Sequence, residues 1–565
     1  ETVSSQVLSP VFFMTTVRHS SAGLTQHRYL VGTALVLISA SGLRQLWAFL
    51  SREQVTLRRQ AKLRRRLRVS ILGAGVGGTA LAQWLRDMYG SDLELTVLSS
   101  EAPGGRVACV EVEGRRYEAG ASIISDLNEY MKGFMRRLGL KETCAKGVHL
   151  PLGIYDGTDF RFRDADPLQA SLRCQFCAKA QDIWQTFRHF GVLNMVRLCT
   201  LWRRADAPKV ARLYRLLRQG KSFATPEEMC EAFGPSCLAL TKQTSSDWLA
   251  SASGGALSDR VVEELVASGM RANYGGQGCT TLHAFVGLVS IAGGLASRCF
   301  AISGGNVQVP QRLLDGAAPD HLELGATARV LRKVQDESLD GFVWEVVDEE
   351  SAEIFGPFDV VAVAHPLECS DLEIRSLDGE RESLSSCARP FRRCVCHFVR
   401  GVLRPQYFSR QQIASATGAV AGPPLELLTV EGSSAPFYSI CLQLPVDVDG
   451  KREARQIVEA SLRGEQATFK VMAPERLSDE ELDEIFHERH GSAKVVDWSG
   501  SCGSYPEYET PQTLRPFVLD NEGSVLYLNA VEQMASAMEM STIAARNAAN
   551  LVAKFVDGKR AVGEL

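Results

Sequence analysis

The chain has 565 residues, of which 45% are hydrophobic and 23% charged, so it holds enough apolar material for a large core and for more than one domain. That composition excludes an intrinsically disordered chain, and the net charge of -4 gives no reason to expect a nucleic-acid partner. The fifteen cysteines are odd in number and have no repeating spacing, which argues against a fully paired secreted framework.

Residues 1–66 are expected to precede the fold. An apolar run from Tyr29 to Leu43 fits the core of a signal peptide better than a membrane span. The segment from Arg52 to Arg68 then carries eight basic residues and one acid, Glu53. If the run stayed as an anchor, those charges would favour a cytosolic domain. The pattern leaves open a signal peptide or anchor, an organelle transit peptide, membrane contact by a basic amphipathic helix within residues 29–66, and a disordered leader.

Residues 67–98 form the clearest pattern in the chain. The apolar run Leu67 to Leu72 predicts a buried strand, Thr79 to Tyr89 has helical spacing, and Leu93 to Leu98 predicts a second strand. Between the first strand and the helix, residues 73–78 spell G-x-G-x-x-G. Strand, glycine turn, helix and strand make one βαβ unit, which favours dinucleotide binding over an ordinary structural turn.

Each glycine of this loop has a physical task. Gly73 permits the tight turn, Gly75 lets the backbone approach a diphosphate, and Gly78 lets the helix pack on the strand. The phosphates would then lie on unpaired N–H groups at the positive end of the helix dipole.

A second glycine pair indicates which dinucleotide is bound. Gly104-Gly105-Arg106 follows the second strand, before a strand-like run from Val107 to Glu113. The G-G-R segment resembles that of flavoproteins of the amine-oxidase and desaturase type, where it covers the flavin and brings a cation near the diphosphate. This favours FAD. The residue that ends the second strand is Ser99, where an acid usually binds the adenosine ribose, and Glu101 could reach from two positions on. The candidate cofactor-binding residues here are Gly73, Gly75, Gly77, Gly78, Ser99, Glu101, Gly104, Gly105, Arg106, Gly120 and Ser122.

The middle of the chain, from Asn128 to about Val286, is expected to be mainly helical. Thr225 followed by Pro226 and two glutamates is a helix start signal. Phe187 to Leu217 combines an apolar stripe with a basic face, which indicates a packed helix or contact with a membrane. The C-x-x-C pair Cys174 and Cys177 favours two helix-face thiols over a zinc or redox site.

Strand-like runs dominate the next part. Residues 328–334, 342–347 and 358–364 predict a β-meander that returns to the cofactor domain, as in two-part FAD folds. His365, at the end of the last run, is interpreted as a polar cap, with a position facing the flavin as the alternative. Cys394 and Cys396 share one face of a further strand and are interpreted as structural.

The C-terminal part predicts a strand at Val525 to Ala530 and a long helix from Val531 to Phe555. Small residues near the helix start permit the close backbone approach that a flavin ring needs. Glu532 and Met538 are the candidate cofactor contacts of this segment.

Together these segments resemble the prenylcysteine oxidase (prenylcysteine lyase) family from about Val69 to Gly558. The matching segments are SILGAGVGGTALAQWLR, GGRVACVEVEGRRYEAGASII, LNEYMKGFMRRLGL, MRANYG, HAFVGLVS, AISGGN, FDVVAVAHPLE and YLNAVEQMASAMEMSTIAARNAA. The resemblance implies an FAD enzyme that uses oxygen to cleave the thioether of farnesyl- or geranylgeranyl-cysteine. The products would be cysteine, a prenyl aldehyde and hydrogen peroxide. It also implies that Arg271, Asn273 and Tyr274 line the catalytic site, with Arg271 holding the cysteine carboxylate, and that no metal is needed.

The family pattern is not matched everywhere. Ser99 replaces an acid, Ala121 a glycine, and Ser125-Asp126 a histidine and proline. A related oxidase with another lipid-like substrate and a non-catalytic accessory subunit of a membrane assembly are therefore the alternatives. The resemblance implies a lysosomal or secretory compartment. The leader could anchor the protein to a membrane there. It also leaves a mitochondrial or plastid membrane as the alternative location.

The expected architecture is α/β, with a two-part Rossmann-like FAD-binding domain and an inserted helical and β substrate domain. The expected divisions are a leader at 1–66, cofactor parts at 67–127, 296–370 and 501–565, a helical cap at 128–295, and a substrate domain at 371–500.

Overall fold

The computed structural model describes residues 63–143, 148, 150–164, 175–204, 210–234, 236–252, 257–294, 298–336, 341–384, 390–408, 422–498, 503–561 and 565. Three predictions fall outside these residues: the apolar run at 29–43, the membrane contact expected for residues 29–66, and the side chains of Cys174 and Cys177. Of residues 29–66, only the last four are described. Within the described part, no helix combines the length and the hydrophobicity needed to cross a bilayer.

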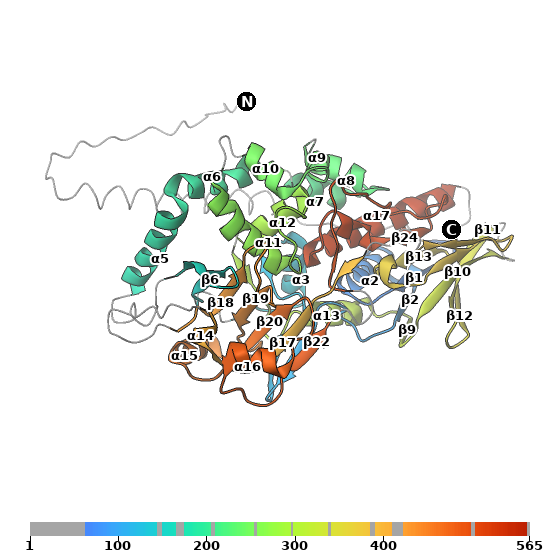
Figure 1. Cartoon of the computed structure of the whole chain (residues 1–565). Helices are drawn as coiled ribbons and strands as arrows, with labels where there is room; N and C mark the ends of the chain where they lie inside the picture. The colour runs from blue at the N-terminus through green and yellow to red at the C-terminus, as the bar shows by residue number, and fades with distance from the viewer. Residues whose placement is uncertain are drawn as a thin grey trace, which may run out of the picture. The chain divides into compact units, whose positions relative to one another are not determined.

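A five-stranded parallel sheet, ordered β24-β13-β1-β2-β9, carries the glycine loop (Figure 1). Its strands are β1 (Leu67–Leu72), β2 (Leu93–Ser99), β9 (His321–Leu324), β13 (Val360–Val363) and β24 (Val525–Tyr527). β1 lies in the middle, and its apolar side chains are excluded from solvent, as expected for a parallel strand covered on both faces. Helix α2 (Val76–Tyr89) connects β1 to β2 and contacts α13 (Gln308–Ala317) and α17 (Met538–Ala561). The Rossmann-like α/β architecture is confirmed.

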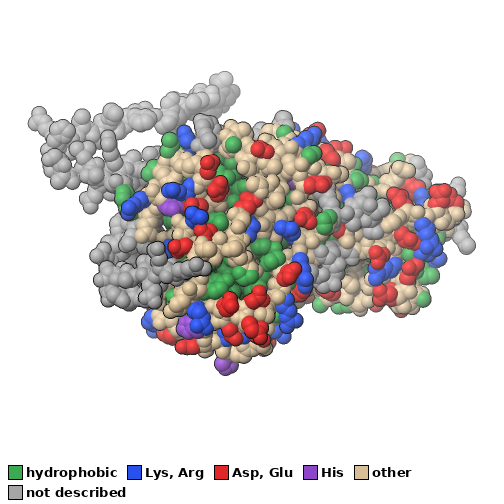
Figure 2. Space-filling view, viewed as in Figure 1, with side chains coloured by type: hydrophobic (Ala, Val, Ile, Leu, Met, Phe, Trp, Pro, Cys, Tyr) green, Lys and Arg blue, Asp and Glu red, His purple; other side chains and the backbone are tan. Residues whose placement is uncertain are grey.

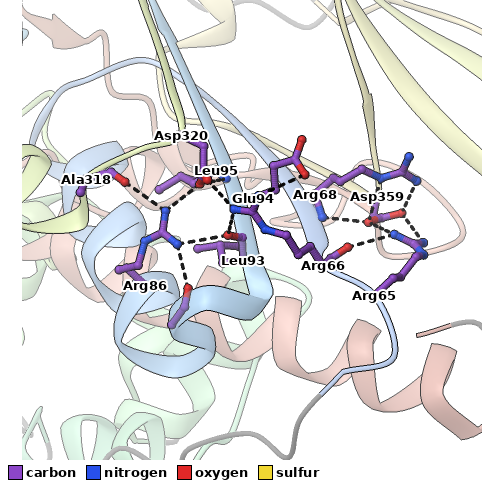
Figure 3. Close-up of polar contacts among 11 residues, drawn as sticks. Arg65, Arg66, Arg68, Arg86, Leu93, Glu94, Leu95, Ala318, Asp320 and Asp359 are labelled. Atoms are coloured by element: carbon purple, nitrogen blue, oxygen red, sulfur yellow. Dashed lines mark hydrogen bonds and ion pairs between the residues drawn. The ribbon is translucent and has the colours of Figure 1, made fainter.

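Ion pairs tie together the amino end of this sheet (Figure 3). Asp359, just before β13, accepts two bonds of 2.7 Å from Arg65 and further bonds from the backbone and side chain of Arg68. Asp320 accepts from Arg66, from Arg86 at 2.8 Å, and from the Leu95 N–H at 3.0 Å.

The folded region therefore begins earlier than the sequence suggested. Leu63 is buried, its N–H donates to the Asp92 carboxylate at 3.3 Å, and Arg65 and Arg66 hold the sheet. The last residues of the expected 1–66 leader thus belong to the fold, because their cations have acidic partners on the sheet.

A separate antiparallel meander follows β9, and its first two strands lie where the pattern placed them. The run at 358–364 returns to the parallel sheet as β13, as expected, whereas the third meander strand was not predicted. The meander consists of β10 (Ala328–Asp336), β11 (Gly341–Asp348) and β12 (Glu353–Phe358), extended by β14 (Glu373–Arg375) and β15 (Arg381–Ser383). β12 leads directly into β13, so the chain re-enters the parallel sheet from this meander.

The largest sheet has eight strands, with the path β21-β17-β20-β19-β18-β6-β7 and β22 paired to β17. They are β6 (Leu152–Tyr155), β7 (Phe160–Arg163), β17 (Val395–Leu403), β18 (Glu426–Thr429), β19 (Ser439–Leu442), β20 (Ala467–Ala473), β21 (Phe486–His487) and β22 (Lys494–Asp497). Its core includes Phe437, Ile440 and Phe469, with α14 (Pro405–Phe408), α15 (Gly450–Leu462) and α16 (Asp479–Ile485) beside it. The expectation of a mainly helical region up to Val286 was wrong at β6 and β7, because β6 pairs in parallel with the distant β18.

The helices of the middle region are α3 (Glu129–Arg137), α5 (Gln175–Phe190), α6 (Val192–Arg204), α7 (Val210–Arg218), α8 (Pro226–Phe233), α9 (Cys237–Leu240), α10 (Ser245–Ala252), the π-helical η3 (Val261–Val266), α11 (Ala267–Asn273) and α12 (Ala284–Gly294). Thr225 caps α8 as predicted, because its side chain accepts the Glu228 N–H at 3.3 Å. Along α6, Leu198 and Leu201 are buried while Leu193 is exposed, so only part of the apolar stripe is packed. Figure 2 shows acidic and basic side chains interspersed over the visible face.

Short paired strands complete the fold: β3 (Cys109–Val112) with β4 (Arg115–Glu118), β5 (Ile124–Ser125) with β8 (Cys299–Phe300), and β16 (Phe391–Arg392) with β23 (Tyr505–Pro506). The 3₁₀ helices are η1 (Gly90–Asp92), η4 (Leu367–Cys369) and η6 (Leu528–Gln533).

The C-terminal helix does not begin where the sequence predicted. β24 ends at Tyr527, η6 follows, and α17 starts only at Met538, not at Val531. Tyr508 explains the delay, because its hydroxyl donates to the Glu532 carbonyl at 3.0 Å and accepts the Ser536 N–H at 2.8 Å. These bonds use backbone groups that a continuous helix would pair internally.

Candidate functional site

The glycine loop between β1 and α2 is built as a tight turn with an open outer side. Gly73 has φ +111°, and its N–H donates to the Leu98 carbonyl at 2.7 Å. A Cβ on Gly78 would lie 2.0 Å from the Gly73 carbonyl oxygen, so only glycine fits there. A Cβ on Gly75 would meet nothing closer than the Gly104 carbonyl at 4.0 Å, and no side chain caps the helix. The first N–H groups of α2 are therefore available to an anion.

The second glycine pair lies directly beside this loop. The Gly104 N–H donates to the Ala74 carbonyl at 3.0 Å, and Gly104 and Gly105 have φ +144° and +56°. A Cβ on Gly105 would come within 3.5 Å of Gly75 Cα. The two glycine segments, about thirty residues apart in sequence, thus form one backbone-lined cradle.

Arg106 extends from this cradle to the C-terminal segment. It forms an ion pair with Glu532, donates to the Ser504 carbonyl at 3.0 Å, and lies 6.0 Å from the centre of the Phe391 ring. Burial disfavours its charge, but Glu532 outweighs that effect and raises the pKa of Arg106. One Glu532 oxygen also accepts from Asn529 at 2.9 Å, and the other is buried without a hydrogen-bond partner in the described structure.

The remaining predicted cofactor residues lie around the same loop. Ser99 ends β2, next to Leu98, and is half-buried, whereas Glu101 is exposed. Gly120 lies against Arg106, since a Cβ there would be 2.0 Å from the Arg106 carbonyl oxygen. Ser122 is half-buried two residues further on. Met538 opens α17, and that helix reaches the loop, because a Cβ on Gly77 would lie 3.6 Å from the Ser541 carbonyl oxygen.

Arg271 carries a partly buried charge at the end of α11. Its guanidinium donates to the Thr429 carbonyl at 3.2 Å, the Thr429 hydroxyl at 3.3 Å and the Gly276 carbonyl at 2.9 Å. It also lies 5.8 Å from the centre of the Tyr438 ring. Within the described part of the chain no carboxylate forms an ion pair with it, and burial lowers the pKa of Arg271. The charge of nearby Glu431 acts in the opposite direction, but Arg271 hydrogen-bonds only to neutral oxygens, so it can bind an anion.

Tyr274 lies three residues after Arg271, and its ring begins an aromatic wall that leads to the cofactor cradle. Its ring is buried and meets Tyr505 at 5.5 Å and Tyr508 at 5.8 Å between ring centres. Burial raises the pKa of all three phenols, which are therefore neutral at physiological pH. Tyr508 bonds to the Glu532 backbone, so the wall ends at the carboxylate that pairs with Arg106.

Asn273 is directed elsewhere, donating to the Ser290 hydroxyl at 2.9 Å. His365 bonds to the Pro366 carbonyl at 3.2 Å, and burial lowers its pKa, in keeping with a polar cap. Sequence reasoning missed Tyr505 and Tyr508. The signal that was available is the pair of tyrosines flanking Pro506 and Glu507 in an otherwise polar stretch.

Two of the departures from the family pattern have structural partners. Asp126 forms an ion pair with Arg298 at 2.7 Å, and the Ala121 carbonyl accepts from Asn306 at 3.0 Å. Ser125 is buried, and its hydroxyl accepts the Leu127 N–H at 3.1 Å. These residues fold the segment after Gly120 without the family's usual side chains.

The fold and the cradle define a Rossmann-like dinucleotide-binding protein. A family model described as NAD(P)-binding Rossmann-like domain matches residues 71–138. A solved structure of a putrescine oxidase variant covers 86% of this chain and 100% of its own, with a TM-score of 0.50 at 15% identity, which shows the shared fold.

A second family model, prenylcysteine lyase, matches residues 182–562. Prenylcysteine oxidase 1 of Mus musculus is 30% identical over 490 residues, covering 86% of this chain and 88% of that protein. The Homo sapiens prenylcysteine oxidase 1 has the same identity and coverage. The chain belongs to the prenylcysteine lyase family, and the predicted resemblance is confirmed.

The cradle fits the FAD that this fold and family imply. Glycine backbone with open space at Gly75, beside an uncapped helix start, suits a diphosphate, and a buried carboxylate oxygen without a partner suits a hydroxyl donor of a cofactor. The predicted cofactor, FAD, is thus supported by fold, family and site together.

Proposed function

We propose that this protein is an FAD-dependent oxidase that cleaves the thioether of prenylcysteine, with farnesyl- or geranylgeranyl-cysteine as substrate. The observation that carries this proposal is Arg271, a desolvated cation whose three hydrogen bonds go to neutral oxygens and which lies three residues before the start of the aromatic wall. A substrate with a carboxylate at one end and an apolar chain at the other matches a cation beside aromatic rings.

The overall reaction converts prenylcysteine, oxygen and water into cysteine, a prenyl aldehyde and hydrogen peroxide. When bound, FAD supplies the acceptor for the hydride that leaves the carbon next to sulfur, and passes its electrons to oxygen. The chain itself orients the substrate and excludes water. Arg271 would hold the cysteine carboxylate, and the neutral phenols of Tyr274, Tyr505 and Tyr508 would line the apolar path.

Ser99 supports a second candidate, a non-catalytic or substrate-shifted homologue that serves as an accessory subunit of a membrane-associated assembly. A serine hydroxyl offers one hydrogen bond where the family usually places a carboxylate for the ribose. Replacing the acid by serine would weaken the binding of FAD, and in the extreme case the protein would not bind FAD at all.

Two measurements separate these candidates. Purified full-length protein is denatured, and the released flavin is identified as FAD by chromatography and fluorescence. Native protein is then given farnesylcysteine, and peroxide and the aldehyde are measured, with farnesol and S-methylcysteine as controls that lack either the amino acid or the prenyl chain. Stoichiometric FAD with peroxide only from farnesylcysteine supports the oxidase. A colourless protein that cannot be reconstituted with FAD supports the accessory subunit.

Location is a separate part of the proposal. We place the protein in an endomembrane or lysosomal lumen, the alternative being the membrane of another organelle. The support is the apolar run at 29–43, whose length fits the core of a cleaved signal peptide. Fractionation of cells expressing the full chain, followed by protease protection with and without detergent, tests this placement, and cleavage without detergent would contradict it.

A further inference from the structure

Helices α5 and α6 carry apolar side chains that the rest of the fold leaves uncovered. The two helices follow one another at one edge of the fold (Figure 1). No other described stretch of similar length exposes more than two large hydrophobic residues. The apolar ridge consists of the five exposed side chains on these helices: Ile183, Trp184, Val192, Leu193 and Val196.

Helix α6 is apolar on two opposite sides, of which the fold covers one. Leu198 and Leu201 form the buried side. Because 3.6 residues make one helical turn, Val192, Leu193 and Val196 lie on the side opposite to them. Leu193 is 62% exposed. The outer side of a surface helix is normally polar, so this second apolar side indicates a partner outside the fold.

The ridge is fixed to the part of the fold that carries the candidate site. The His189 ring nitrogen lies 2.6 Å from the Glu264 carboxylate, and the Asn194 side chain donates to the Ser258 hydroxyl at 3.0 Å. Glu264 belongs to η3, which continues directly into α11, the helix that carries Arg271. The ridge is therefore anchored to the helical segment that leads to the candidate site.

Basic residues accompany the ridge. Residues 183–218 contain eight arginines and lysines and one acid, Asp206, although the whole chain has a net charge of -4. Arg188, between the two halves of the ridge, is exposed and has no acidic partner in the described structure. The same is true of Arg212 and Arg215 on α7. An apolar helix side accompanied by cations is typical of helices that lie in the interface of an anionic bilayer.

We infer that the apolar ridge is a docking surface for an anionic lipid membrane. Its aliphatic side chains enter the boundary of the acyl chains, Trp184 lies at the level of the headgroups, and Arg188 binds lipid phosphate. The contact is made from one side of the bilayer and needs no helix that spans it. The sequence left a packed helix and membrane contact as alternatives for this region, and α6 serves both, one on each side.

Fluorescence quenching tests the position of Trp184 directly. Full-length protein is mixed with vesicles of phosphatidylcholine and phosphatidylserine that carry bromine on their acyl chains, which quench a nearby indole. We expect wild type to be quenched and Trp184→Phe, which keeps an aromatic ring, to lose a clear part of that quenching. If the two proteins are quenched equally, the ridge is not in the bilayer, even where residues 1–62 bind the vesicles.

Paired substitutions test the aliphatic residues. Val192→Ser with Leu193→Ser should weaken vesicle binding about tenfold in a flotation assay. Ile354→Ser with Leu377→Ser is the matched control, because those side chains are 53% and 52% exposed on a different sheet. An equal loss in both pairs, or no loss in either, would overturn the inference.

Charge is tested with vesicles that contain or lack phosphatidylserine. Arg188→Gln should weaken binding to the anionic vesicles about fivefold and leave binding to the neutral ones unchanged. Wild type should bind the anionic vesicles more tightly and lose that advantage as salt is added. Equally tight binding to both kinds of vesicle would overturn the choice of an anionic surface.

Two other occupants give different outcomes without lipid. If a second copy of the chain covers the ridge, wild type sediments as a dimer and the Val192→Ser, Leu193→Ser variant as a monomer. If another segment of the same chain covers it, aqueous iodide quenches wild type and Trp184→Phe equally. Either result would overturn the inference. Because no measurement depends on turnover, the oxidase proposal can fail while the docking surface stands.

Discussion

The two ends of the parallel sheet differ in whether their charged and polar groups have partners within the protein. At the amino end, Arg65, Arg66, Arg68 and Arg86 all bond to the carboxylates of Asp359 and Asp320 (Figure 3). At the carboxyl end, the start of α2 has no side-chain cap, and one Glu532 oxygen is buried without a partner. The two carboxylates at the amino end find their partners within the protein, whereas the helix start and the Glu532 oxygen at the carboxyl end are left for a ligand.

This contrast separates stability from function. Removing a group from the amino end leaves buried charges unpaired, so the cost falls on folding. A substitution at the carboxyl end changes what the cradle can hold, so it weakens the binding of cofactor or substrate. Each of the four variants below changes one residue at one of these two ends.

Asp359→Ala should have the largest effect, a loss of about 3 kcal/mol of unfolding free energy, because two arginines lose their shared carboxylate. Chemical denaturation measures it, with FAD affinity unchanged for the folded fraction. Asp371→Ala is the matched control, since Asp371 pairs with Arg329 but its side chain is 90% exposed.

The same variant carries a pH signature. Burial disfavours the charged form of Asp359, but the bonds from Arg65 and Arg68 outweigh it and lower its pKa. Its contribution to stability is therefore present above the unfolded pKa of about 3.9 and is lost as the pH falls through the lower folded value. Wild type and Asp359→Ala should converge in stability on acidification, and a constant gap would contradict the assignment.

Gly75→Val should weaken FAD binding at least 100-fold, about 2.7 kcal/mol, while leaving the apoprotein folded. Gly75 has φ -75° and open space at its Cβ, so valine fits the backbone and fills the cradle. Flavin absorbance after gel filtration measures the loss. Gly558→Ala, on α17 with nothing near its Cβ, is the control. A yellow Gly75→Val preparation would show that the diphosphate lies elsewhere.

Arg271→Gln should raise KM for farnesylcysteine about 30-fold, close to 2 kcal/mol, because a charged hydrogen bond to the substrate carboxylate is lost. Its stability should fall less than that of Arg68→Gln, since it leaves neutral acceptors behind and no ion-paired carboxylate. Arg68→Gln is the counterpart at the other end and should lose stability with KM unchanged. Should Arg271→Gln lower stability and leave KM alone, Arg271 would be structural.

Ser99→Asp should have the smallest effect, tightening FAD binding about fivefold, near 1 kcal/mol, by restoring a carboxylate at the end of β2. Titration of the apoprotein with FAD measures it. Glu101→Gln, an exposed neighbour, tests whether that acid already serves the ribose, in which case it should weaken binding and Ser99→Asp should do little.

Local patterns predicted the cofactor half of the molecule well. The strands at 67–72 and 93–98, the helix between them, the first two meander strands and the strand that returns to the parallel sheet lie where periodicity placed them, whereas β12 was missed. In these segments the hydrophobic period and the glycines agree with the tertiary environment, so short-range information was sufficient.

Long-range pairings were beyond sequence reasoning. β6 and its hairpin partner β7 belong to a sheet whose remaining strands lie more than 230 residues away, and the Tyr274–Tyr505 contact joins segments of similar separation. The start of α17 moved from Val531 to Met538 because Tyr508 binds the intervening backbone. One sequence gives no signal for contacts between residues so far apart. Each of these residues is a polar or aromatic side chain whose neighbours in the sequence do not mark it as unusual.

The clamp of Arg68 on Asp359 joins residues 291 positions apart. At a synthesis rate of roughly 5–20 residues per second, β1 waits about 15–60 s for its second neighbour to leave the ribosome. During that interval the apolar edge of a central strand faces solvent. The first βαβ unit is therefore completed as a sheet only after the whole inserted region has been synthesised.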